Sequence, residues 1–211
     1  MHDTPQVARE LEAELARQGF AFVEGERMRG WLDAAGTLSD WPAFAASWND
    51  LHLDQYMADG GRYRRRRYAV FATGRSGTIT LSPREPHWQS RDYNALNGGI
   101  ARWFEPIDPA LACGDSLGTV LRWFRELCDD LVPQARGWHI EVHQFRIEAG
   151  ASQPGQPTPE GMHRDGVDFV LVLMIGRSNI REGTTSIHAL DGARLGSFTL
   201  ARAFDAAIVE D

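Results

Sequence analysis

From Trp138 onward the chain consists of short strand-like segments, and this pattern restricts the possible folds more than any other feature. Residues 138–148, 169–176, 183–190 and 206–209 are mostly apolar, β-branched or aromatic, and Gly, Pro and Asn lie between them. Short strands in close succession are typical of an antiparallel sandwich or barrel. The pattern therefore predicts a mainly β core at the C-terminal end.

The first part of the chain mixes predicted helices with strands. Val7, Leu11 and Leu15 recur at helical spacing, and Gly19 is expected to end that helix. The other predicted elements are a strand over 20–23, a helix starting near 39–40, strands over 62–73 and 78–81, and a helix starting at 115 or 116. Because 211 residues suit one large domain, we expect a single α+β domain over residues 1–211. Residues 1–137 would pack on a barrel core formed by 138–211.

Composition excludes several classes of protein. The net charge is −7, and an acidic chain is a poor general nucleic-acid binder, because such affinity comes mainly from neutralised phosphates. The longest apolar run, residues 169–175, is far too short to span a bilayer. The N-terminus lacks a signal-peptide pattern, and two cysteines do not make a disulfide scaffold. We therefore expect a cytoplasmic protein without a nucleic-acid or membrane partner.

A candidate metal motif follows a Gly- and Pro-rich loop at 149–161. Residues 159–166 read Pro-Glu-Gly-Met-His-Arg-Asp-Gly, which places His163 two positions before Asp165. In an extended chain, residues i and i+2 point to the same side, so both side chains can reach one ion. With a second histidine they would form the two-His-one-carboxylate arrangement of non-haem iron(II) enzymes. Spacing alone leaves open a turn-forming or hydrogen-bonded pair.

Several further segments carry a family resemblance. They are Val142-His143-Gln144-Phe145-Arg146-Ile147, residues 159–166, Arg177-Ser178-Asn179-Ile180, Gly60 to Tyr68 (GGRYRRRRY) and Asn94 to Phe104 (NALNGGIARWF). In order and number they resemble bacterial 2-oxoglutarate- and iron(II)-dependent dioxygenases of the isoleucine dioxygenase type, which hydroxylate free amino acids. The resemblance covers most of the chain from about Leu51.

The resemblance implies a fold, a chemistry and two ligands. The fold is a double-stranded β-helix, a cupin-like jelly-roll barrel. His163 and Asp165 would bind Fe(II), 2-oxoglutarate would be the cosubstrate, and a small free L-amino acid would be hydroxylated. The family also needs a distal histidine and a basic residue for 2-oxoglutarate. We expect both beyond Asp211, together with the last strands of the barrel, and we interpret His188 as a structural or exposed residue rather than a substitute.

Strand alternation leaves other candidates open. Gln144 and Arg146 share one face of the 138–148 strand, and His143 lies on the other face. Whichever face lines the pocket can contact 2-oxoglutarate or substrate. Arg64 to Arg67 can capture a carboxylate or pair with acidic residues, and we favour pairing. Two alternative functions also stay open: a non-catalytic jelly-roll binding module, and a cupin-like metalloenzyme that does not use 2-oxoglutarate.

Overall fold

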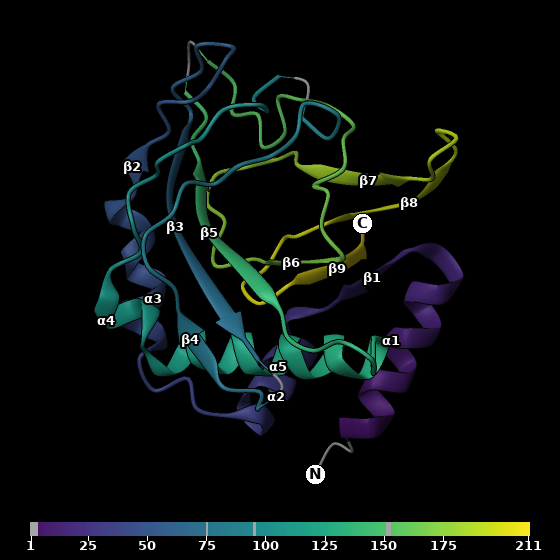
Figure 1. Cartoon of the computed structure of the whole chain (residues 1–211). Helices are drawn as coiled ribbons and strands as arrows, with labels where there is room; N and C mark the ends of the chain where they lie inside the picture. Colours follow the sequence, from purple (N-terminus) through teal and green to yellow (C-terminus); the bar gives the residue numbers. More distant parts are fainter. Residues whose placement is uncertain (1–3, 75, 95, 151–152) are drawn as a thin grey trace. The chain divides into compact units, whose positions relative to one another are not determined.

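The structure is a computed structural model that describes residues 4–74, 76–94, 96–150 and 153–211 (Figure 1). Two compact units divide the chain. Unit 1 comprises Met1–Leu38, Thr119–Gln134 and Val167–Asp211, and unit 2 comprises Ser39–Gly118 and Ala135–Gly166. The organisation of residues 1–211 as one domain stays a prediction.

Unit 1 combines helices with two antiparallel sheets. Its elements are α1 (Thr4–Gln18), β1 (Phe20–Val23), α2 (Gly25–Ala35), most of α5 (Asp115–Leu131), β6 (Phe169–Leu173), β7 (Thr184–His188), β8 (Arg194–Thr199) and β9 (Ala206–Glu210). The sheet order is β1-β9-β6, and β7 pairs with β8. Strand β9 is central because both of its edges are paired. Its residues Ala206, Ala207 and Ile208 are fully buried.

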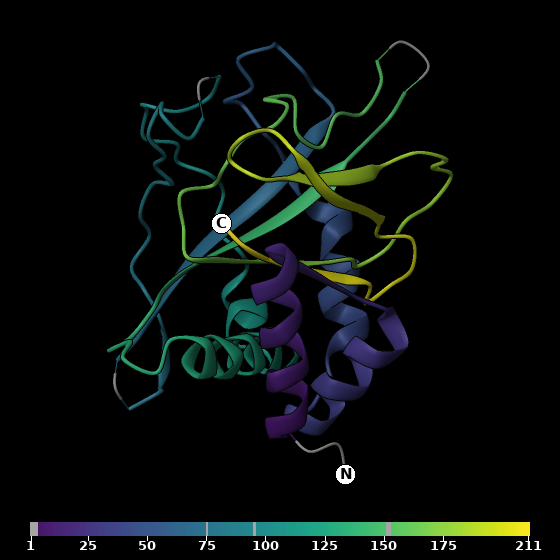
Figure 2. The same cartoon turned by 90° about the vertical axis from the view of Figure 1, so that its right-hand side faces the viewer.

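Local sequence explains how unit 1 begins. Leu11 and Leu15 of α1 are buried, as their helical spacing predicts. Gly19 ends the helix with φ of +74°, a left-handed conformation that glycine adopts without strain, and its N–H donates to Leu15 O. Figure 2 shows α1 beside α2, and Arg27 of α2 forms an ion pair with Glu10 of α1.

Unit 2 is built around one long strand. Its elements are α3 (Trp41–Ala46), the 3₁₀ helix η1 (Ser47–Asp50), β2 (His52–Leu53), β3 (Arg64–Thr73), β4 (Ile79–Leu81), α4 (Pro109–Ala112) and β5 (His139–Ile147). Strand β5 pairs along one edge of β3, while β2 and β4 pair with opposite ends of its other edge. All of these pairings are antiparallel.

The predicted mixture of helices and antiparallel strands is confirmed. Within the described residues each sheet is open, because no strand order returns to its starting strand. Strand β8 and helix α2 were not predicted from the sequence. In the part of the chain that the structure describes, no helix is long and apolar enough to cross a membrane.

Candidate metal and substrate site

One face of the β3–β5 ladder carries most of the polar chemistry of unit 2. Cross-strand partners share a face, and the register pairs Arg66 with Phe145 and Tyr68 with His143. This face, here called the triad face, also holds Arg64 and Glu141, because alternate residues of a strand point to the same side. The opposite face holds Arg65, Arg67, Gln144 and Arg146.

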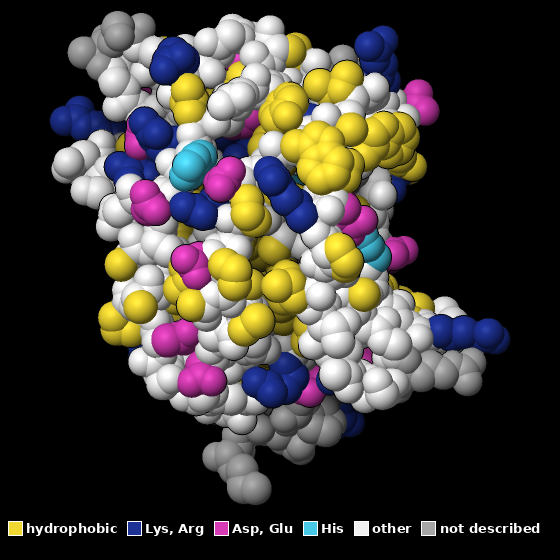
Figure 3. Space-filling model, turned by 60° about the vertical axis from the view of Figure 1, so that its left-hand side comes forward, with side chains coloured by type: hydrophobic (Ala, Val, Ile, Leu, Met, Phe, Trp, Pro, Cys, Tyr) yellow, Lys and Arg dark blue, Asp and Glu magenta, His cyan; other side chains and the backbone are white. Residues whose placement is uncertain are grey.

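The arginine run alternates between these two faces. Arg64 and Arg66 are buried, and Asp54 Oδ2 lies 2.8 Å from Arg64 Nε and 3.5 Å from Arg66 Nη1. Arg65 pairs with Glu148, and Arg67 pairs with Asp50. The favoured interpretation of the run, arginines paired with acidic residues, is therefore confirmed for all four. Figure 3 shows basic and acidic side chains interspersed over one surface of the molecule.

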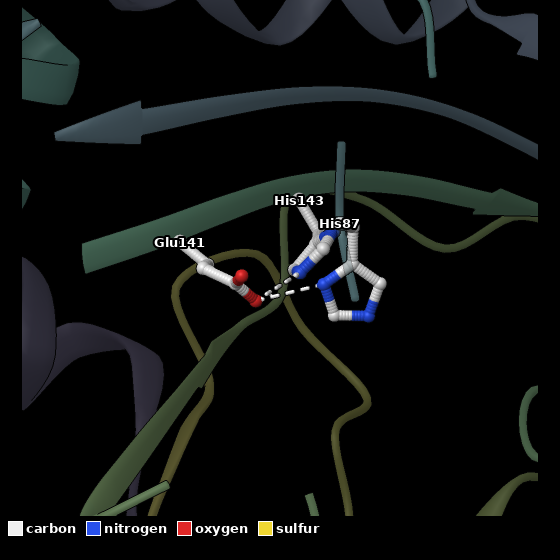
Figure 4. A group of neighbouring side chains, drawn as sticks. All are labelled: His87, Glu141 and His143. Atoms are coloured by element: carbon white, nitrogen blue, oxygen red, sulfur yellow. Dashed lines mark hydrogen bonds and ion pairs between the residues drawn. The ribbon is translucent and has the colours of Figure 1, made fainter. Parts of the chain in front are cut away.

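Three side chains of the triad face meet in a group of metal-ligand type. His87, Glu141 and His143 bring their ligand atoms within 4.8 Å of one another, the one such group found among the described residues. Figure 4 shows both imidazole rings beside the Glu141 carboxylate. Glu141 Oε2 lies 2.9 Å from His87 Nδ1 and 3.6 Å from His143 Nε2. Burial raises the pKa of Glu141, but the hydrogen bonds from His143 and His87 outweigh it, so that the pKa lies well below its ordinary value.

The hydrogen bonds of this group indicate that the imidazole rings hold the Glu141 carboxylate rather than bind a metal ion. Arg66 donates from Nη2 to His143 Nδ1, and a guanidinium can only donate. The neutral His143 ring therefore carries its proton on Nε2, the nitrogen that faces Glu141. Burial, and then the charge of Arg66, lowers the pKa of His143 to about 3, which keeps the ring neutral. With one lone pair used and the other nitrogen protonated, His143 has no ring nitrogen available for an ion.

The H-x-D pair has the donors that a metal ion needs. His163 Nδ1 lies 2.8 Å from Gly161 O, so Nδ1 carries the proton, and Nε2 faces Asp165 Oδ1 at 3.6 Å. Two ligands that each lie about 2.1 Å from a first-row ion are at most about 4.2 Å apart, so this pair fits one ion. The hydrogen bond to Asp165 raises the pKa of His163 to about 9, and the same bond lowers the pKa of Asp165. A bound dication would take the place of that proton.

The H-x-D pair is connected to the segment of His87 through Gln89. Gln89 Nε2 donates to the backbone oxygen of Asp165 at 3.0 Å, and Gln89 follows His87 by two residues. Asp165 is also close enough to His143 for the two groups to interact electrostatically. Unit 2 therefore brings His163 and Asp165 into the electrostatic neighbourhood of His87, Glu141 and His143.

Gln144 and Arg146 lie on the opposite face of the ladder. Gln144 is 1% exposed and its Nε2 donates to Ser47 Oγ, while Arg146 donates from Nη1 to Trp48 O. Both side chains thus contact the 3₁₀ helix η1, and neither shares the face of His143. Their predicted contact with 2-oxoglutarate is untested. His188 belongs to β7 in unit 1, where its Nδ1 lies 3.2 Å from Gly192 O, in keeping with a structural role.

Sequence reasoning missed His87 and Glu141. Glu141 has a local signal, because His139, Glu141 and His143 alternate on one side of a single strand. His87 has none. Its backbone forms a β-bridge with Arg102, and its ring contacts Glu141 only because tertiary folding brings these distant segments together.

Comparisons with known proteins identify the class of enzyme. The family described as 2OG-Fe dioxygenase matches residues 45–211. The chain belongs to this family, whose members use Fe(II) and 2-oxoglutarate, and the dioxygenase chemistry expected from the sequence is confirmed.

Three particular proteins are similar to the chain. The 3(1)-hydroxy-L-isoleucine 4-dioxygenase of Pantoea ananatis is 27% identical over 187 residues, which cover 85% of this chain and 74% of that protein. The L-isoleucine-4-hydroxylase of Bacillus thuringiensis is 24% identical over 152 residues, which cover 69% and 63%. The crystal structure of a bsmA homologue from Methylobium petroleophilum PM1 superposes with a TM-score of 0.83 at 32% identity, covering 96% of this chain and 80% of that one.

Proposed function

We propose that this dioxygenase hydroxylates a free L-amino acid, with isoleucine or a hydroxylated isoleucine as the first candidate. The names of the two relatives support this substrate class. A small zwitterion also suits the triad face, on which ionised groups of both signs, Arg66 and Glu141, lie on either side of neutral His143. The two alternatives, a binding module without catalysis and a metalloenzyme independent of 2-oxoglutarate, have no observation in their favour.

The H-x-D pair is the observation that carries the proposal. His163 Nε2 and Asp165 Oδ1 would bind Fe(II), which would supply the O₂ activation that oxidation of an unactivated C–H bond requires. Gly161 O fixes the tautomer of His163, and Gln89 holds the backbone at Asp165. These contacts set the ligands before the ion arrives, which favours binding at this place.

The double-stranded β-helix belongs to the same proposal. The β3–β5 ladder would form one wall of the barrel, with the triad face turned inward. The similarity to the bsmA homologue over 96% of this chain supports a shared fold. We leave Gln144 and Arg146 out of the proposed site, because they lie on the face that η1 contacts.

Metal binding tests the ligand assignment. His163→Ala and Asp165→Ala should each reduce anaerobic Fe(II) binding at least about tenfold, since loss of one ligand leaves a single protein donor in this pair. They should also remove the weak absorption band of 2-oxoglutarate chelated to the metal. His188→Ala is the matched control, because this histidine lies in a strand outside the motif and should leave both readouts unchanged. Equal Fe(II) binding by all variants would refute the assignment.

Turnover tests the substrate class. The protein with Fe(II), 2-oxoglutarate and O₂ should release succinate when isoleucine or a related aliphatic amino acid is added, together with a product heavier by one oxygen atom. Succinate at background level across a panel of free amino acids would reject the substrate class. Succinate formed only with other small molecules would assign the enzyme a different substrate.

A further inference from the structure

The Glu141 carboxylate is held by two buried side chains of unit 2. The Tyr68 hydroxyl donates to Oε1 at 2.8 Å, and His87 Nδ1 lies 2.9 Å from Oε2. Tyr68 is 4% exposed and His87 is 9% exposed, so both supports are fixed by the core of unit 2. The side chain of Glu141 itself stays 23% exposed. The carboxylate is therefore oriented on one side and accessible on the other.

This carboxylate has capacity for a cationic ligand. Two of its neighbours are neutral: burial raises the pKa of the Tyr68 hydroxyl above its ordinary value, and His143 carries no charge at neutral pH. A carboxylate offers about four lone-pair sites, and Tyr68, His87 and His143 approach three of them, while the exposed ring of His139 has its Nε2 3.7 Å from Oε1. An ionised group that is partly removed from water gains stability from an opposite charge, so a ligand cation would be favoured here.

The cation that fits best is an ammonium group rather than a second metal ion. A metal ion needs lone pairs from the imidazoles, and Arg66 occupies Nδ1 of His143 while Nε2 of that ring is protonated. The fixed charge of Arg66 would also repel a dication more strongly than a monocation. An ammonium group presents N–H donors, which a carboxylate accepts directly.

Glu141 and the H-x-D motif contact two nearby residues of one short segment. His87 contacts Glu141, and Gln89, two residues later, contacts Asp165 O. Two residues of extended chain span at most about 7 Å. The two contacts thus lie at neighbouring positions of one segment, so an amino acid bound through its nitrogen at Glu141 would have the H-x-D motif nearby.

We propose that Glu141 binds the ammonium group of the amino-acid substrate, with Tyr68 and His87 orienting the carboxylate. The inference rests on the proposed function and adds to it the group that selects amino acids over other carboxylic acids. Glu141 is then a substrate-binding residue and not an iron ligand. It sets which end of the substrate faces the metal.

Two ligands and two variants test this assignment. Isoleucine and 3-methylpentanoic acid share a carbon skeleton, and only isoleucine carries the ammonium group. Dissociation constants come from the change that each ligand causes in the chelate absorption of anaerobic protein with Fe(II) and 2-oxoglutarate. Glu141→Gln keeps the size and the acceptor for Tyr68 but removes the charge. Glu148→Gln is the matched control, because Glu148 pairs with Arg65 and Arg146 away from the triad.

Wild-type protein should bind isoleucine at least about tenfold more tightly than 3-methylpentanoic acid, as expected for a charge-assisted contact. Glu141→Gln should remove this preference and Glu148→Gln should keep it. Glu141→Asp retains the charge and should therefore retain part of the preference for isoleucine. A purely structural role of Glu141 would not predict this.

Three results would overturn the assignment. The first two are equal binding of both ligands by wild-type protein and full retention of the preference by Glu141→Gln. The third is a loss of bound iron from Glu141→Gln in metal analysis, which would make the triad a metal site. Failure of the proposed function is distinct, because no amino acid would then yield succinate even with wild-type protein.

Discussion

Asp54 provides the counter-charge for two buried arginines, and removing it should strongly destabilise the protein. Its side chain is 0% exposed, and those of Arg64 and Arg66 are 6% and 3% exposed. One carboxylate oxygen contacts both guanidinium groups, and the other accepts the N–H of Tyr56. Asp54→Asn keeps the shape of the side chain and removes only the charge. Two buried cations then lose their nearest anion.

The expected loss is large compared with the stability of a typical domain. Breaking a buried ion pair costs about 3–5 kcal/mol, because the remaining charge stays buried without compensation. Whole domains are stable by only about 5–15 kcal/mol. Urea unfolding followed by circular dichroism measures the difference between wild type and variant.

An exposed aspartate of η1, which pairs with an arginine of β3, provides the control. Asp50 is 88% exposed and lies 3.1 Å from Arg67 Nη2. Asp50→Asn should change stability by at most about 1 kcal/mol, because solvent screens the pair. If the two variants lose stability to within about 1 kcal/mol of each other, the buried charge pairing does not stabilise the fold as argued.

Two further predictions concern the candidate site. The pKa of His143 is lowered to about 3 by burial and Arg66, against about 6.5 unfolded, so the unfolded chain binds more protons between these values and stability falls as pH drops through that window. The side chain introduced by His143→Gln cannot titrate, so the free energy of unfolding of this variant should fall less steeply as the pH drops, by up to about 1.4 kcal/mol per pH unit. Parallel curves for the variant and the wild type would contradict this. Gly166→Ala should lower the melting temperature more than Gly161→Ala. Both glycines have positive φ, but only at Gly166 would an added Cβ meet the Tyr93 ring, at 2.6 Å. Equal shifts in melting temperature for the two variants would show that the ring moves aside at little cost.

Local sequence patterns predicted many of the secondary-structure elements. The strand over 20–23 matches β1, the strand over 138–148 contains β5, and the helix from 115 matches α5. These elements follow from residue periodicity and from breakers such as Gly19, which act over a few residues. Strand β8, with the sequence Arg-Leu-Gly-Ser-Phe-Thr, was missed because a glycine and polar residues interrupt its alternation.

The sequence by itself determined the H-x-D pair and the enzyme class. His163 and Asp165 are two residues apart, so backbone alternation alone can bring them to one ion, and the quoted motifs carry the family. The tertiary structure decided which face of β5 carries the group of His87, Glu141 and His143. Alternation states that His143 and Gln144 point opposite ways, but the packing of η1 on one face leaves the other to the triad. Only folding brings His87 to Glu141, because contacts between distant segments depend on strand pairing and burial, which no short stretch of sequence encodes.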